Sequence, residues 1–177
     1  GTVTRGLCRF APNFSPRITA PYVGVRHLGR DNLELPLEEW VIVKGTSNGH
    51  PYFMSVNDSL KQFYGKNEYP SCLIITIELM EVQGHKLPTD SEAEILNDIE
   101  DTLLSMLSEV TLPILIGRET YYGEREIIVY FPKLSNYKSV LDSISIKLNS
   151  NRCVHLELHD DPKWEQAVRY LGCFNDA

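Results

Sequence analysis

Alternating and clustered hydrophobic residues predict a β-hairpin in the first third of the chain. The runs "WVIVKG" from Trp40 and "PYFMSV" from Pro51 are rich in β-branched and aromatic residues. Between them, Asn48-Gly49 supplies the two positive φ angles that a tight hairpin turn requires. The next run, "SCLIITIELMEV" at 71–82, is longer and more continuously apolar, which predicts a buried strand.

A helical period indicates two helices, at 89–110 and 135–150. In the first, Thr89, Asp90 or Ser91 is available as the N-cap. Its expected apolar face consists of Ile95, Ile99, Leu103, Met106, Leu107 and Val110. The second helix carries Tyr137, Val140, Leu141, Ile144 and Leu148. Both helices therefore have one face suited to cover a sheet.

Three further strands complete the predicted body. "LPILIGRET" at 112–120 and "EREIIVYF" at 124–131 bracket a short turn and form a second hairpin, and "RCVHLEL" at 152–158 follows the second helix. From 71 onward the order is β-α-β-β-α-β, which is the split-βαβ plan of ferredoxin-like domains. We therefore predict an α+β fold in which two helices cover one face of an antiparallel sheet, and the first hairpin extends the sheet or covers an edge.

The last strand has an expected register. Because side chains alternate across a strand, Val154, Leu156 and Leu158 should lie beneath the helices, with His155 and His159 on the opposite, open face. In the following "DDPKWEQAVRYL", Asp160 or Asp161 can cap a C-terminal helix that has Pro162 at its first position. The apolar stripe of that helix would be Trp164, Val168 and Leu171.

Residues 1–36 show neither the two-residue period of a strand nor the 3.6-residue period of a helix, and they contain four prolines. We therefore interpret them as an extended arm before a single domain at 37–177. The arm also divides the charge. Residues 1–30 hold five arginines and no acid, whereas the rest of the chain holds 12 bases against 24 acids. We expect the arm to pack across an acidic surface, either of its own domain or of a second copy in a homodimer.

Composition narrows the class of partner. An acidic body repels phosphates, which argues against a nucleic-acid partner, and no apolar run approaches the roughly 20 residues needed to cross a bilayer. The four cysteines contain no C-x-x-C pair, so a zinc ribbon is not indicated and a reducing cytoplasm is expected. No P-loop, G-x-S-x-G or G-x-G-x-x-G occurs, so standard hydrolase and nucleotide motifs are absent and no cofactor is expected.

Two groups of side chains are candidates for function. His155, Glu157, His159 and Asp160 are the residues that a hydrolase or metal-dependent enzyme would use, but two histidines about 13 Å apart along a strand cannot share a metal without a bend. A polar strand face without metal is the simpler interpretation. In the second hairpin, Arg118 and Arg125 flank Tyr121 and Tyr122 at the tip.

That hairpin has two interpretations. Opposite charges can pair across its strands, or its tyrosines and arginines can anchor a partner protein. The candidate binding residues are therefore Arg118, Tyr121, Tyr122, Arg125, His155 and His159.

Four segments together resemble a known family. Trp40, "IEDTLLSML" at 99–107, "GRETYYGEREIIVYF" at 117–131 and "HDDPKWEQAVRYL" at 159–171 resemble the bacterial domain-of-unknown-function family six-ninety-five, over residues 38–171. Members are similar in organisation to the B-type protein regulator of ribonuclease E, an acidic ferredoxin-like inhibitor. The resemblance implies a cytoplasmic binding or regulatory domain with no assigned reaction.

The leading hypothesis is accordingly a non-enzymatic module that contacts a protein through its open sheet face or the Tyr121-Tyr122 hairpin. An enzyme using His155, Glu157, His159 and Asp160 is the alternative. Small-molecule sensing at a subunit interface, as in other ferredoxin-like domains, is a third hypothesis.

Overall fold

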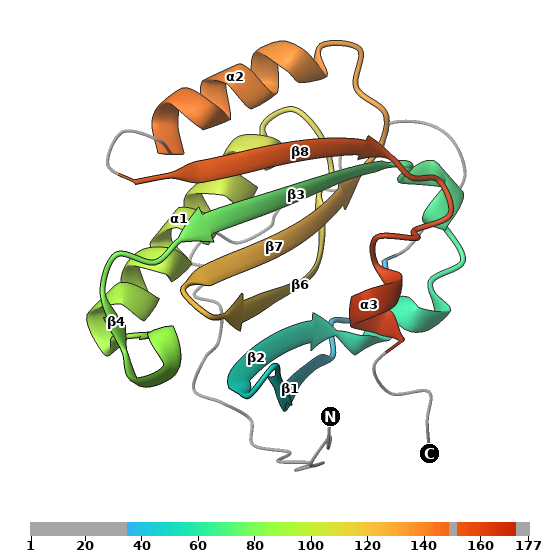
Figure 1. Cartoon of the computed structure of the whole chain (residues 1–177). Coiled ribbons are helices and arrows are strands. Elements are labelled where there is room, and N and C mark those ends of the chain that lie inside the picture. The colour runs from blue at the N-terminus through green and yellow to red at the C-terminus, as the bar shows by residue number, and fades with distance from the viewer. Residues whose placement is uncertain (1–34, 149–151, 173–177) are drawn as a thin grey trace.

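A computed structural model describes residues 35–148 and 152–172, and this part forms an α+β structure around one six-stranded antiparallel sheet (Figure 1). The strand order is β1-β2-β6-β7-β3-β8. The strands are β1 (Trp40–Ser47), β2 (His50–Asn57), β3 (Ser71–Glu78), β6 (Ile114–Tyr121), β7 (Glu124–Phe131) and β8 (Val154–Asp160). The helices are α1 (Asp90–Ser108), α2 (Tyr137–Leu148) and α3 (Val168–Leu171), with short 3-10 turns η1 (Asp58–Gln62), η2 (Lys66–Glu68) and η3 (Gly84–Lys86). A separate two-stranded ribbon joins β4 (Val82–Gln83) to β5 (Leu87–Pro88).

Both predicted hairpins are present, and each has a two-residue turn with positive φ. In the β1–β2 turn, Asn48 and Gly49 have φ of 50° and 81°. In the β6–β7 turn, Tyr122 and Gly123 have φ of 45° and 94°. The first hairpin extends the sheet, because β2 pairs with β6 in antiparallel register.

Helices α1 and α2 cover the same face of the sheet, and the predicted register of β8 is confirmed. Val154 is buried in the core beneath these helices, and Leu156 and Leu158 pack against that core while partly exposed. His155 is exposed on the opposite face, where His159 is half-buried. The predicted cap of α1 is also present, since Thr89 Oγ1 accepts a hydrogen bond from Glu92 N at 3.2 Å.

The buried face of α1 agrees with the predicted apolar stripe only in part. Leu103 and Leu107 are buried and Ile99 and Met106 pack against the core, whereas Ile95 and Val110 are 43% and 44% exposed. The buried line also includes residues outside the predicted stripe, namely Glu92, Leu96 and Glu100. Two glutamates face inward because arginines from other elements meet them, Arg152 at Glu92 and Arg118 at Glu100. Hydrophobicity alone could not identify that face.

The sequence predicts that the second face of the sheet is open, but the structure leaves it open only in part, around the exposed His155 and Glu157 of β8. A second core covers the part formed by β2, β6 and β7, where Trp164, Tyr170 and Leu171 pack together with η1. Figure 1 shows α3 on the side of the sheet that faces the viewer. Gly117 permits the close approach, because a Cβ at this position would lie 2.9 Å from Tyr170 Cδ1 and 2.4 Å from the Ser55 carbonyl oxygen.

The predicted C-terminal helix is much shorter than expected. It covers only Val168–Leu171, Trp164 has a φ of 59° that a right-handed α-helix does not allow, and Val168 is 63% exposed. Asp161 caps this turn without starting a helix at Pro162. Its carboxylate accepts hydrogen bonds from Glu165 N and Gln166 N, both at 2.9 Å, and from Tyr130 Oη at 2.5 Å. The buried indole of Trp164, which stacks on Tyr130, determines the path of the chain here.

Asp161 and its neighbour Asp160 provide a matched test of this arrangement. Asp161 is buried, which opposes its charge, but the hydrogen bonds from Tyr130, Gln166 and Glu165 more than offset burial and hold its pKa below the usual range. We expect Asp161→Asn to lower the free energy of unfolding by about 1–2 kcal/mol at neutral pH. Asp160→Asn should change it by less than about 0.5 kcal/mol, since Asp160 is exposed.

The contribution of Asp161 to the free energy of unfolding should depend on pH in a known direction. Because the folded pKa of Asp161 is lowered, its stabilising effect is present above the ordinary aspartate pKa of about 3.9 and is lost as the pH falls below it. The difference between the wild type and Asp161→Asn in urea unfolding should therefore shrink between neutral pH and pH 3. A constant difference, or equal effects of the two substitutions, would contradict the assigned role.

The predicted packing of the arm, residues 1–36, falls almost wholly outside the described residues, which begin at Leu35. Within the described ranges, no helix is long and apolar enough to span a membrane.

Candidate functional site

Three turns that are distant in the sequence meet at one end of the sheet. The β1–β2 and β6–β7 turns are neighbours because β2 pairs with β6, with Tyr52 opposite Tyr121. The loop that contains β4, η3 and β5 joins them through a hydrogen bond from Leu79 N to Gly123 O at 2.8 Å. A second bond, from Thr89 N to Glu81 O at 3.1 Å, closes this loop at its base.

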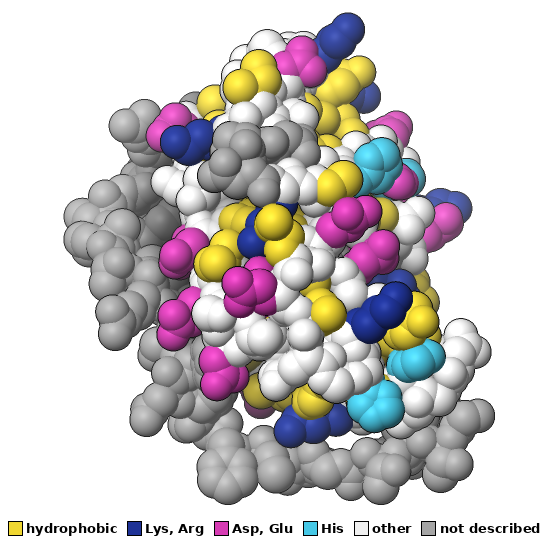
Figure 2. Space-filling model, turned by 60° about the vertical axis from the view of Figure 1, so that its left-hand side comes forward, with side chains coloured by type: hydrophobic (Ala, Val, Ile, Leu, Met, Phe, Trp, Pro, Cys, Tyr) yellow, Lys and Arg dark blue, Asp and Glu magenta, His cyan; other side chains and the backbone are white. Residues whose placement is uncertain are grey.

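The turns bring aromatic and cationic side chains together, and we refer to His50, His85, Lys86, Tyr121 and Tyr122 as the turn cluster. The ring centroids of His50 and Tyr122 are 4.2 Å apart, and those of His50 and His85 are 6.3 Å apart. Lys86 Nζ lies 4.1 Å from the centre of the Tyr122 ring, a cation–π distance. Figure 2 shows this end of the molecule at its lower right, where two histidine side chains lie next to each other beside a cation.

The cluster is exposed and firmly connected at the same time. His85, Lys86 and Tyr122 are exposed, whereas His50 and Tyr121 are half-buried. Tyr121 Oη donates a hydrogen bond to Ser47 O at 3.2 Å, which links the two hairpin turns. The side chains that a ligand would meet first therefore lie on half-buried residues, one of which is hydrogen-bonded to the neighbouring turn.

The backbone of the turn cluster adopts conformations that ordinary residues avoid. In the described part of the chain, five non-glycine residues have positive φ, and four of them lie in these turns: Asn48, His85, Lys86 and Tyr122. Positive φ is uncommon outside glycine and asparagine, and it is unfavourable for a bulky residue such as tyrosine. Such conformations are found disproportionately at functional sites.

The sequence-predicted hairpin residues separate into two groups. Tyr121 and Tyr122 belong to the turn cluster, but Arg118 and Arg125 project beneath α1 on the helix-covered face. Arg118 Nη1 contacts Glu100 Oε1 at 2.5 Å, and Arg125 donates to Asn97 Oδ1 at 3.0 Å and to Thr120 Oγ1 at 3.1 Å. Arg118 therefore forms its ion pair with α1, and Arg125 bonds both to α1 and across the hairpin to the neutral Thr120, which corrects the interpretation that opposite charges pair across these strands.

Burial affects the charges of this internal network. It lowers the pKa of the Arg125 guanidinium to about 10, with the nearby charge of Arg118 acting in the same direction. Burial likewise raises the pKa of Glu100, although Arg118 and Arg125 partly offset the effect. Arg125 is 7% exposed, so it is positioned to hold α1 against the sheet and not to meet a partner.

The predicted histidine group lies on β8, away from the turn cluster. His155 Nε2 and His159 Nε2 lie 3.2 and 3.5 Å from the two carboxylate oxygens of Glu157. Asp160 does not join them. Among the described residues, no group of three or more His, Cys, Asp or Glu side chains is arranged to hold a metal ion.

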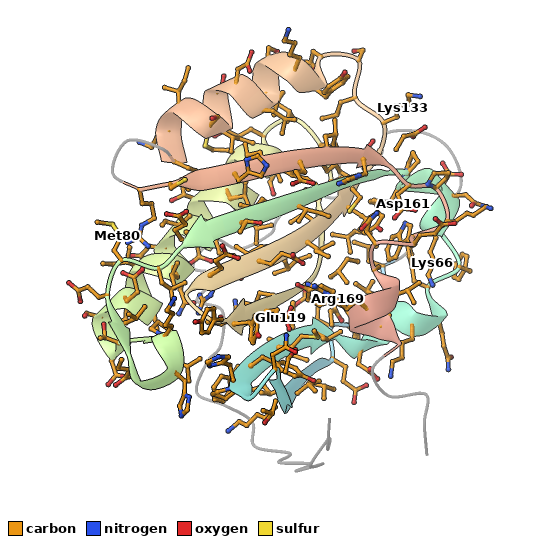
Figure 3. All side chains as sticks on the ribbon, in the orientation of Figure 1. Lys66, Met80, Glu119, Lys133, Asp161 and Arg169 are labelled. Carbon is orange, nitrogen blue, oxygen red and sulfur yellow. The ribbon has the colours of Figure 1, made fainter. Side chains whose placement is uncertain are left out.

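Other reactive side chains are held by internal packing. Burial raises the pKa of the Cys72 thiol to about 12, so it stays protonated at neutral pH and is a poor nucleophile. On the same face, Arg169 Nη2 contacts Glu119 Oε2 at 3.0 Å and also pairs with Glu126, and Figure 3 shows Arg169 and Glu119 pointing toward each other. These contacts fasten α3 to the sheet.

Sequence reasoning missed three members of the turn cluster: His50, His85 and Lys86. His50 follows the Asn48-Gly49 turn directly, and "GHK" stands at 84–86 in a loop. The available signal was that histidine and lysine occupy turn positions where glycine or asparagine would cost less. That signal has no meaning until the backbone angles are known.

A comparison with models of known protein families shows to which family the chain belongs. Residues 38–171 match a family described as "Family of unknown function (DUF695)". The chain belongs to the DUF695 family. The match confirms the family that the sequence motifs indicated, and it includes the whole sheet and every member of the turn cluster. No curated protein and no solved structure matches this DUF695 chain significantly.

Proposed function

We propose that this DUF695 chain is a non-enzymatic binding module that contacts a partner protein through the turn cluster. The observation that carries the proposal is the gathering of His85, Lys86 and Tyr122, all exposed, from two separate loops beside a half-buried support. Tyrosine side chains surrounded by well-packed neighbours are typical of the energetic centres of protein interfaces. His155 and His159 are no longer part of the proposed surface, because they lie on β8.

The finer fold assignment belongs to this proposal. A ferredoxin-like arrangement is supported by the chain order β3-α1-β6-β7-α2-β8, by the spatial order β6-β7-β3-β8, and by helices α1 and α2 on one face. The β1–β2 hairpin would then be an extension of the sheet at the β6 side. A regulatory role like that of the B-type protein regulator of ribonuclease E stays a prediction from the sequence.

The proposal includes expectations about the cellular compartment, the class of partner and the oligomeric state. The free thiols of Cys72 and Cys153 support a reducing cytoplasm. The net charge of the body from Leu35 to Gly172, 12 bases against 21 acids, argues against a nucleic-acid partner. A homodimer through the arginine-rich residues 1–30 remains a separate prediction, because the turn cluster does not involve that segment.

Site-specific photocrosslinking tests the proposed contact in the cells that make the protein. A photoreactive benzoylphenylalanine replaces Tyr122 in the full chain, and the matched control carries it at Tyr64, which is 75% exposed and lies between η1 and η2. We expect a discrete protein adduct from position 122 that position 64 does not give, and the captured protein should bind the purified chain. No adduct specific to position 122 would overturn the proposal.

A further inference from the structure

We infer that the turn cluster recognises a single carboxylate group on its partner, an inference that rests on the proposed binding function. Lys86 supplies the positive charge, His50 and His85 supply ring N–H donors, and the Tyr122 ring packs against the chain that carries the carboxylate. The ligand class is thus a peptide segment with one carboxylate in otherwise neutral or apolar surroundings, such as a chain's C-terminal carboxylate.

The charge of Lys86 is not neutralised by an internal ion pair. Within the described ranges, no carboxylate oxygen lies within 4.0 Å of its ammonium, whereas Lys61, Arg118, Arg152 and Arg169 each have such a partner. The ammonium instead lies over the Tyr122 ring, 4.1 Å from its centre. A cation placed on a ring in this way keeps its other donors available, and a carboxylate is the strongest hydrogen-bond acceptor that proteins offer them.

His50 adds an unsatisfied polar atom at the same place. Its Nδ1 has almost no exposed surface and no hydrogen-bond partner among the described residues. A buried nitrogen without a partner costs folding free energy, so structures usually supply one. The rings of Tyr122 and His85 lie against His50, and displacement of an exposed neighbour by a ligand would give this nitrogen its missing partner.

The backbone supports a role for the side chains themselves. His85, Lys86 and Tyr122 have φ of 59°, 57° and 45°, values at which glycine or asparagine would be less strained. If these positions served only to turn the chain, replacement by glycine or asparagine would be favourable. Position 85 is instead a histidine, position 86 a lysine and position 122 a tyrosine. A contact made by these side chains with a ligand would compensate for the strain and explain why they are there.

The surroundings favour a singly charged ligand. The body has a net charge of −9 over the stretch from Leu35 to Gly172, and the cluster itself has one lysine and no arginine. Close to the β6–β7 turn, Glu78 and Glu124 lie opposite each other on β3 and β7. A phosphoryl group, which carries up to two charges and is typically bound by arginines or several backbone amides, would be repelled more strongly.

A matched pair of small probes tests the inference on the full chain. N-acetylphenylalanine carries one carboxylate beside an aromatic ring, and its amide differs only in lacking the charge. Titrations are followed by backbone amide NMR shifts of Gly49, Gly84 and Gly123, the glycines of the three turns. We expect saturable shifts with the acid and at least about tenfold weaker binding of the amide, since loss of one charge-assisted contact corresponds to roughly that factor.

Two variants show whether the turn cluster is responsible for binding the acid. Lys86→Gln should weaken binding of the acid at least about fivefold. Lys44→Gln on β1, which removes an ammonium that lies 5.4 Å from the centre of the Phe53 ring on β2, should leave this binding unchanged. Equal binding of acid and amide, or equal effects of the two variants, would overturn the carboxylate assignment.

The outcomes also separate this inference from the proposed function. Tighter saturation by inorganic phosphate than by the acid would show that the ligand class is wrong. A specific crosslink at position 122 without binding of the acid would retain the protein contact and reject its carboxylate chemistry. Binding of the acid without any crosslink would support the site and reject the protein partner.

Discussion

Replacement of Trp164 by alanine is expected to lower the free energy of unfolding by about 3–5 kcal/mol, enough to unfold a marginally stable domain. Trp164 is 2% exposed and stacks on Tyr130, with ring centroids 4.4 Å apart. Its indole N–H donates to the Tyr69 carbonyl at 3.0 Å. The substitution would leave a large cavity in the second core and remove this hydrogen bond. Urea unfolding measures the effect.

Two further variants divide this loss between packing and hydrogen bonding. Trp164→Phe keeps a ring in the core but removes the indole donor, and we expect it to cost less than the alanine variant. Trp40→Ala removes a half-buried tryptophan whose indole donates to Glu38 at an exposed site, and its effect should be below about 1.5 kcal/mol. If Trp164→Ala is no more destabilising than Trp40→Ala, Trp164 is not central to the second core.

Replacement of Arg152 by methionine is expected to lower the free energy of unfolding by about 3–5 kcal/mol at neutral pH. Glu92 is 1% exposed, and Arg152 binds both of its carboxylate oxygens, at 2.6 and 3.2 Å. Without the guanidinium, the carboxylate would keep its hydrogen bonds from the backbone amides of Met80 and Glu81 but lose its counter-charge. An uncompensated buried charge is the cause of the expected loss. The measurement is again urea unfolding.

A double variant and a pH series identify that cause. Glu92→Gln combined with Arg152→Met removes both charges and should recover at least half of the loss. Burial opposes the charge of Glu92, but Arg152 and the backbone amides of Met80 and Glu81 outweigh burial and hold its pKa below the usual value. Glu92 therefore stabilises the wild type above the ordinary glutamate pKa of about 4.3, and this contribution is lost as the pH falls.

The difference between the wild type and Arg152→Met should accordingly narrow in acid, where Glu92 of the variant takes up a proton. Lys61→Met serves as a control, because Lys61 forms an ion pair with Asp58 at 2.7 Å and both side chains are partly exposed. Its expected cost is at most about 1 kcal/mol. An equally large effect of Lys61→Met would show that burial of the Glu92–Arg152 pair is not the reason for its importance.

The local elements and the faces of the strands could be predicted from the amino-acid sequence. The Asn48-Gly49 turn, the Thr89 cap and the alternation of Val154, Leu156 and Leu158 all follow from properties of residues close together in the chain. Such features are predictable because side-chain direction repeats every two residues in a strand and because turns and caps depend on a few neighbouring φ angles. The family relationship was visible in the same short motifs.

The roles of the polar and aromatic residues could not be predicted in this way, because they depend on contacts between distant parts of the chain. Glu92 and Glu100 lie inside because arginines from distant elements meet them, and Trp164 leaves helical geometry because Tyr130 and the Tyr69 carbonyl hold its ring. The turn cluster exists only because β2 pairs with β6, which places residue 50 beside residue 122, and because the loop from β3 adds residues 85 and 86. Local periodicity carries no information about contacts between residues so far apart in the chain, since these depend on how the whole sheet is ordered.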